Sequence, residues 1–307
     1  MELVLAQPRG FCAGVDRAIE IVERALERFA PPVYVRHEIV HNQHVVDDLR
    51  ARGAIFIEDP ADAPAGAVLV FSAHGVSPAV KRAAEDHALR VIDATCPLVT
   101  KVHVETRRLA KDDYEIVMVG HAGHVEVEGT MGQAPDRMHL VETVADVEKL
   151  DLRDRDRVGC VTQTTLSVDD TRDILEALQV RYPAIRVPRK DDICYATQNR
   201  QDAVKLLAED AQLVFVIGAP ASSNSNRLVE VARRLGARAY LVQDESEIDP
   251  AWLEDAQTIG ITAGASAPEH LVQSVVKRLE QLAPGAELRQ QPAVDEGVVF
   301  QLPALLR

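Results

Sequence analysis

The chain has 307 residues, of which 47% are hydrophobic and only 4% aromatic, so aliphatic side chains must build its core. A formal net charge of −14 repels phosphate backbones and argues against nucleic-acid binding. The sequence shows no basic and apolar leader and no run of about 18 apolar residues, so we expect no signal peptide and no membrane span. A cytoplasmic protein with reduced cysteines is therefore expected.

Short apolar runs alternate with amphipathic helical patterns along the chain. The runs cover residues 3–6, 68–71, 116–119, 213–217 and 259–261. Parallel strands that are buried on both faces have continuous apolar runs of this kind. The alternation therefore predicts an α/β protein with parallel sheets.

The helical patterns between these runs carry recognisable starts. The first pattern places four apolar residues on one face: Val15, Ile19, Val22 and Leu26. Later helices are expected to begin after the cap residue Ser77, after Ser167 in a sequence like a capping box, and at Pro268. Residues 151–157 are a charge run that predicts a solvated loop, and residues 298–302 predict an extra strand near the end of the chain.

Three of the four cysteines mark similar blocks of sequence, which begin at Cys12, Cys96 and Cys194. At comparable offsets in each block, polar residues follow apolar runs: His41, His124 and Ser222, then His74, Thr164 and Ser266. Ligands bind beyond the carboxyl ends of parallel strands. The pattern therefore predicts three similar α/β units with parallel sheets, arranged in pseudo-threefold fashion around a central site. We expect domains at residues 13–96, at residues 97–190, and at residues 1–12 together with 191–307, which include a C-terminal tail.

These three cysteines have glycine, proline or polar neighbours and are expected to precede helices, whose N-termini stabilise the metal-binding thiolate. Cys160 lies in an apolar run and is expected to be a buried core thiol. Three thiolates suit zinc with a histidine as the fourth ligand, or an iron–sulfur cluster that keeps one iron open. Spacing alone leaves both alternatives open.

Other polar residues predict anion binding and proton transfer. Residues 220–227 and 263–268 offer hydroxyl and amide donors at expected helix starts, which suits an anion as well as helix capping. Glu126 and Glu128 alternate with valine and are expected on one strand face, with Glu126 as a proton donor beside the His124 turn. Five histidines are expected on helix faces or in loops without a chemical role: His37, His87, His103, His139 and His270.

Nine motifs, in this order, resemble the 4-hydroxy-3-methylbut-2-enyl diphosphate reductases, which close the non-mevalonate isoprenoid pathway. They lie at residues 8–15, 38–42, 72–75, 93–97, 120–126, 162–167, 192–197, 222–227 and 262–268. The resemblance implies three α/β domains around a 4Fe–4S cluster that is held by Cys12, Cys96 and Cys194 and has one open iron. It implies reductive dehydration of the substrate with two electrons and two protons, giving isopentenyl diphosphate or dimethylallyl diphosphate.

The resemblance also implies roles for individual residues. Thr164, Glu126 and His124 are expected to be catalytic. The residues expected to bind the substrate are His41, His74, His124, Thr164, Ser222, Ser223, Asn224 and Ser266. The implied electron donor is a ferredoxin or a flavodoxin, for which Arg189 and Lys190 form a candidate basic docking pair.

Two rival functions use the same residues. A zinc hydrolase would be colourless, whereas a cluster protein is brown. A non-catalytic iron–sulfur sensor would normally carry a DNA-binding or signalling module, and none is visible in the sequence. The donor-rich residues 222–226 favour a small anionic substrate over a sensor.

Overall fold

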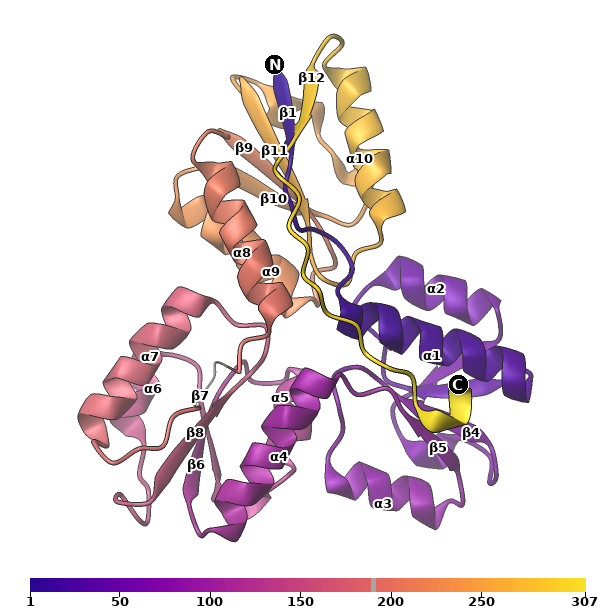
Figure 1. The fold of residues 1–307 in the computed structure, drawn as a ribbon, viewed down its shortest axis with the longest axis vertical. Coiled ribbons are helices and arrows are strands. Elements are labelled where there is room, and N and C mark those ends of the chain that lie inside the picture. Colours follow the sequence, from indigo (N-terminus) through magenta and orange to yellow (C-terminus); the bar gives the residue numbers. More distant parts are fainter. Residues whose placement is uncertain (189–191) are drawn as a thin grey trace. The chain divides into compact units, whose positions relative to one another are not determined.

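Parallel strands form three sheets in the computed structural model, which describes residues 1–188 and 192–307 (Figure 1). The predicted basic pair Arg189 and Lys190 lies outside the described residues. The chain divides into two compact units. The first unit comprises Met1–Val15, His41–Val45 and Tyr195–Val299, and the second comprises Asp16–Val40, Val46–Cys194 and Phe300–Arg307. The predicted boundaries of three domains stay a prediction.

The first unit contains a five-stranded sheet in the order β10-β9-β11-β1-β12. Its strands are β1 (Glu2–Leu5), β9 (Leu213–Ile217), β10 (Arg238–Val242), β11 (Thr258–Ala263) and β12 (Glu287–Gln290). Its helices are α8 (Tyr195–Ala208), α9 (Ser223–Arg234) and α10 (Glu269–Leu282). Alternate residues of the central strands pack against α10 on one face and against α8 and α9 on the other (Figure 1). Burial of both faces explains why the central strands appear as continuous apolar runs.

The second unit contains a four-stranded sheet in the order β3-β2-β4-β5 and a three-stranded sheet in the order β7-β6-β8. The four-stranded sheet contains β2 (Val33–Arg36), β3 (Ala54–Ile57), β4 (Val68–Phe71) and β5 (Arg90–Asp93). The three-stranded sheet contains β6 (Glu115–Val119), β7 (Met138–Val141) and β8 (Val158–Thr162). Every strand pair in both sheets is parallel.

The remaining helices follow strands of these sheets or connect them. They are α1 (Ala13–Phe29), α2 (Gln43–Ala51), α3 (Pro78–Asp86), α4 (Pro97–Lys111), α5 (Val125–Met131), α6 (Val144–Lys149) and α7 (Val168–Arg181). Short 3₁₀ helices are η1 (Pro60–Asp62), η2 (Pro135–Arg137), η3 (Glu245–Glu247), η4 (Pro250–Leu253) and η5 (Ala304–Leu306). No helix among the described residues is long and apolar enough to span a membrane.

The α/β class and the parallel sheets predicted from the sequence are confirmed, and each of the five apolar runs overlaps a strand. The predicted helix starts are also confirmed. The Ser77 hydroxyl accepts a hydrogen bond from the Val80 amide at 3.3 Å, and Ser167 accepts from the Asp170 amide at 3.2 Å. Residues 151–157 contain no helix or strand, as expected for a charge run.

Two predictions of secondary structure outside the candidate site are wrong. Residues 298–302 form no strand, and Val299 is 89% exposed, because an apolar run becomes a strand only where a partner strand is available to pair with it. The additional strand is β12, which pairs with β1 at the edge of the sheet. His139, expected on a helix or in a loop, lies in β7 beside β6, where its Nε2 is 2.7 Å from a carboxylate oxygen of Glu115.

Candidate active site

Three cysteines lie immediately before helices, as the sequence predicts. Cys12 precedes α1, Cys96 is the N-cap residue of α4, and Cys194 precedes α8. Each of them is half-buried. Cys160 differs because it lies within β8 and is 1% exposed. Burial raises the pKa of the Cys160 thiol far above its usual range, so this thiol stays protonated and is unsuited to metal binding.

One backbone hydrogen bond recurs at all three of these cysteines. Their amides donate to carbonyl groups at N···O distances of 3.3 Å for Cys12 to Ala265, 3.0 Å for Cys96 to Ala73 and 3.0 Å for Cys194 to Thr164. Thr164 is itself a predicted substrate-binding residue, and Ala265 and Ala73 directly precede two others, Ser266 and His74. The blocks recognised in the sequence therefore correspond to a repeated local structure, in which a cysteine is tied to the loop beyond a neighbouring strand.

Glu126 is a buried carboxyl group whose partner is Thr164. Glu126 is 3% exposed, and its two oxygens accept from the Thr164 amide at 2.6 Å and from the Thr164 hydroxyl at 3.0 Å. Burial raises the pKa of Glu126 to about 7, although the two bonds from Thr164 act in the opposite direction. The negative charge of Asp192 raises this pKa further. Glu126 is therefore close to half protonated at neutral pH.

The predicted strand around Glu126 is wrong, because residues 125–131 form helix α5. Residues two apart point to nearly opposite sides of a helix. Glu126 is accordingly buried, whereas Glu128 is exposed. The predicted proximity of Glu126 to the His124 turn is nevertheless confirmed, since His124 is the N-cap residue of the same helix.

The imidazole of His124 has a defined orientation. Its Nδ1 accepts a hydrogen bond from the Glu126 amide at 3.2 Å, so a neutral ring carries its proton on Nε2. The ring centroid of His74 is 6.2 Å from that of His124, and the His74 Nδ1 is 3.3 Å from the Ser72 hydroxyl. These two predicted substrate-binding histidines thus lie next to each other at the ends of β4 and β6.

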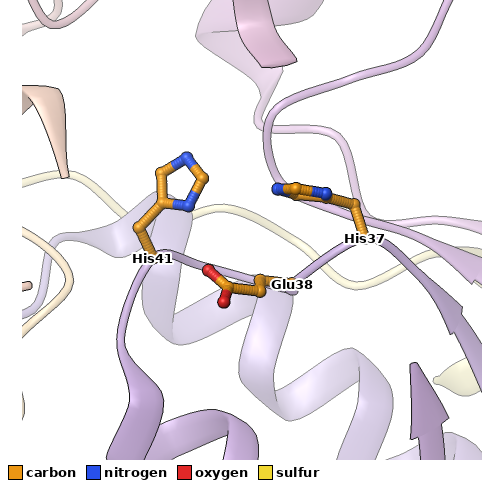
Figure 2. A group of neighbouring side chains, drawn as sticks. All are labelled: His37, Glu38 and His41. Atoms are coloured by element: carbon orange, nitrogen blue, oxygen red, sulfur yellow. The ribbon is translucent and has the colours of Figure 1, made fainter. Parts of the chain in front are cut away.

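His37 was predicted to have no chemical role, but its ring centroid is 6.0 Å from that of His74. His37, Glu38 and His41 lie on the short segment that follows β2, and their ligand atoms are within 4.8 Å of one another (Figure 2). The sequence signal that could have identified His37 is its place directly after an apolar strand. We take His37 as a neighbour of the predicted substrate-binding histidines.

The first unit contributes a group of buried donors at the start of α9. Ser222, Ser223 and Asn224 are all buried, and the Ser222 hydroxyl caps the helix by accepting from the Ser225 amide at 3.3 Å. In the side chain of Asn224, neither Oδ1 nor Nδ2 has a hydrogen-bond partner among the described residues. A buried polar group without a partner costs about 1–3 kcal/mol. The side-chain amide of Asn224 can therefore hydrogen-bond a bound group.

The loop beyond β11 packs closely against this helix start. A Cβ atom at Gly264 would lie 2.0 Å from the Ser225 hydroxyl oxygen and 3.0 Å from the Asn224 amide nitrogen, so only glycine permits the observed packing. In the same loop, the Ser266 hydroxyl donates to the His41 carbonyl at 3.0 Å. The structure therefore brings together, within the first unit, the predicted residues from three separate segments.

The predicted site residues thus fall into two groups, one in each unit. The first unit holds Cys12, His41, Ser222, Ser223, Asn224 and Ser266. The second unit holds Cys96, Cys194, His74, His124, Glu126 and Thr164. The first group includes hydroxyl and amide donors, and the second combines imidazoles with an ionisable buried carboxyl group.

Comparison with known proteins assigns the family. The family model described as LytB protein matches residues 3–280. The chain is 60% identical over 306 residues to the 4-hydroxy-3-methylbut-2-enyl diphosphate reductase of Azoarcus sp., with 100% of this chain and 98% of the relative covered. It is 61% identical over 302 residues to the enzyme of the same name from Bordetella pertussis, with 98% and 93% covered.

A solved structure is similar as well. The E-1-hydroxy-2-methyl-but-2-enyl-4-diphosphate reductase of Plasmodium falciparum matches with a TM-score of 0.96 and 41% identity, with 99% of this chain and 96% of that chain covered. The match confirms the resemblance that the nine sequence motifs indicate. The chain therefore belongs to the LytB protein family, the family of the 4-hydroxy-3-methylbut-2-enyl diphosphate reductases, and is an oxidoreductase.

Proposed function

We propose that the chain converts 4-hydroxy-3-methylbut-2-enyl diphosphate to isopentenyl diphosphate and dimethylallyl diphosphate by two-electron reductive dehydration. The names of its relatives support this reaction. The observation in this chain that carries the proposal is the buried Glu126–Thr164 pair. Loss of a hydroxyl group requires a proton on the departing oxygen, and a carboxyl group with a pKa of about 7 is suited to deliver it.

A 4Fe–4S cluster held by Cys12, Cys96 and Cys194 fits the local structure of these cysteines. Each thiol lies at a helix start, which favours the thiolate, and each cysteine has the same backbone anchor. This equivalence supports a group with three like sulfur ligands more than a zinc ion with mixed ligands. When bound, such a cluster supplies the electrons and an open iron for the substrate oxygen.

Binding of the diphosphate must rely on local donors, because the net charge of −14 repels an anionic substrate. We propose that Ser222, Ser223 and Asn224 bind it at the N-terminus of α9, where the helix dipole favours negative charge. His41 and Ser266 would extend this group in the first unit. His74 and His124 would contribute imidazole donors from the second unit.

Proton delivery follows from the hydrogen bonds around Thr164. The Thr164 amide holds one oxygen of Glu126 in place, and the Thr164 hydroxyl contacts the other. When Glu126 is protonated, its proton can pass to the Thr164 oxygen while the Thr164 hydroxyl proton passes to the substrate oxygen. His124 Nε2–H is a second proton donor next to this pair. We assign the catalytic role to Glu126, Thr164 and His124.

The remaining expectations are consistent with this function. A ferredoxin or a flavodoxin would deliver the electrons, in the cytoplasm, without a role for nucleic acid or membrane. The test is anaerobic purification followed by visible and electron paramagnetic resonance spectra and by incubation with the substrate and a chemical reductant. A brown, iron- and sulfide-containing protein that forms the two products is expected. A colourless zinc protein that releases phosphate would favour the hydrolase instead.

A further inference from the structure

Arg200 has the largest side chain among the fully buried residues described, and it is 0% exposed. It lies on α8, and its guanidinium donates to the Gly10 carbonyl at 3.0 and 2.7 Å and to the Phe11 carbonyl at 3.1 Å. Gly10 and Phe11 directly precede Cys12. A buried guanidinium is tolerated only when its donors and its charge are satisfied. Here those donors fix the backbone of the Cys12 loop.

The charge of Arg200 is balanced by the segment of chain that follows β12. The carboxylate of Glu296 accepts from Arg200 Nη1 at 3.0 Å and from Nη2 at 3.4 Å, and it also accepts from the Asn199 amide at 3.0 Å. Residues 291–303, which include Glu296, form no helix or strand. The Gln291 amide holds the start of this segment by donating to the Leu5 carbonyl at 2.9 Å, and the Glu296 carboxylate ties the segment to α8.

Arg17 repeats this arrangement in the second unit. Its Nη1 donates to the Ala94 carbonyl at 3.3 Å and to the Thr95 carbonyl at 3.2 Å, which are the two residues before Cys96. Its Nε donates to the Gln301 carbonyl at 2.8 Å. In both units, an arginine thus joins the two residues before a cysteine to the C-terminal tail, defined as residues 291–307.

We propose that the C-terminal tail fastens the Cys12 and Cys96 loops, and that Arg200 and Arg17 are positioning residues for the group those cysteines bind. The inference rests on the proposed function, because it assigns the arginines to the cluster. The physical reason is that groups which orient metal ligands control how firmly the metal is held. Loosening either loop should misplace one sulfur ligand while the other two keep their anchors.

The test uses two variants of the full chain. Glu296→Ala removes the carboxylate that balances Arg200, and Arg17→Lys keeps the charge but loses the planar fork that reaches two carbonyls and the tail. The matched controls are Glu287→Ala, an exposed glutamate on β12, and Arg24→Lys, an exposed arginine on α1. Glu296→Gln keeps a hydrogen-bond acceptor and should rescue part of any defect, and it serves as the test variant if Glu296→Ala does not fold.

Two readouts are measured without oxygen. The first is the rate of iron release to a chelator, which should rise roughly 10-fold or more in both variants and stay at the parent rate in both controls. The second is residue-resolved alkylation of the apoprotein. Cys12 should react faster only in Glu296→Ala, Cys96 should react faster only in Arg17→Lys, and Cys194 should be unchanged in both.

Iron release within twofold of the parent in both variants would overturn the proposal. Faster alkylation of all three cysteines in either variant would also overturn it, because general loosening is not positioning. If the parent itself binds no iron, the proposed function fails, and the alkylation pattern still decides whether the tail fastens the two loops.

Discussion

Replacement of Glu126 by glutamine tests both the energetics and the chemistry of the site. Glutamine keeps the shape, and its amide can still accept from the Thr164 amide and donate to the Thr164 oxygen. It cannot ionise and cannot act as an acid. The variant should therefore keep its cluster and its substrate affinity, while turnover falls at least ~100-fold, the usual scale of general acid catalysis.

The pKa of Glu126 adds a stability effect with a definite sign. Burial raises this pKa from 4.5 to about 7, so the folded chain binds the proton more tightly than the unfolded chain does. Protonation therefore stabilises the folded parent below pH 4.5, and this stabilisation is lost as the pH rises through about 7. Since one pKa unit is about 1.4 kcal/mol, the loss between pH 5 and pH 8 should be roughly 2–3 kcal/mol.

The assay is urea unfolding of the apoprotein at both pH values, for the parent and for Glu126→Gln. The free energy of unfolding of the variant minus that of the parent should become more positive by this amount between pH 5 and pH 8. The kinetic measurement is single-turnover reduction of the substrate with a chemical electron donor. The rate of this reduction by the parent should fall above pH 7. Glu128→Gln is the control, because Glu128 is exposed on the same helix.

Two results would refute this reasoning. A difference in unfolding free energy that does not change with pH would show that Glu126 does not carry the raised pKa. A Glu126→Gln variant that reduces the substrate as fast as the parent would show that the proton comes from elsewhere, with His124 or the diphosphate as the next candidate.

Three further predictions concern ligands and donors. Replacing any one of Cys12, Cys96 and Cys194, the proposed ligands, by serine should remove most of the bound iron, whereas Cys160→Ser should keep it. Iron and sulfide counts decide, and normal iron in one of the first three variants would contradict the assignment. Ser222→Ala combined with Asn224→Ala should weaken substrate binding without changing the cluster spectrum, and unchanged affinity in an equilibrium titration would leave this motif a helix cap alone. Thr164→Val removes the hydroxyl that relays the proton, so turnover should fall. It also removes a donor that lowers the pKa of Glu126, so the remaining pH dependence should move to higher pH. A pH profile like that of the parent would exclude the relay.

The sequence predicts the parts of this fold that are fixed by local patterns. The apolar run at residues 213–217 has the continuous pattern of a parallel strand that is buried on both faces. The cysteines were placed before helices because glycine, proline and polar residues surround them. Such signals are contained in a few consecutive residues.

Features that depend on distant partners could not be predicted. The valine–glutamate alternation at residues 125–128 is compatible with a strand, but the N-cap at His124 and the burial of Glu126 against Thr164 produce a helix. Arg200 lies in a polar stretch that is typical of a solvated helix face. Its burial depends on Glu296, which is 96 residues away along the chain.

The burial of Cys160 has a practical consequence for counting thiols. Cys160 lies on β8 with its side chain buried, and burial raises the pKa of its thiol. This thiol should therefore not react with a thiol reagent while the chain is folded. Native apoprotein should therefore titrate as three reactive thiols, and denatured protein as four. The fourth thiol becomes an internal standard, because its appearance reports the unfolded fraction in the same sample in which oxidative loss of the other three is measured.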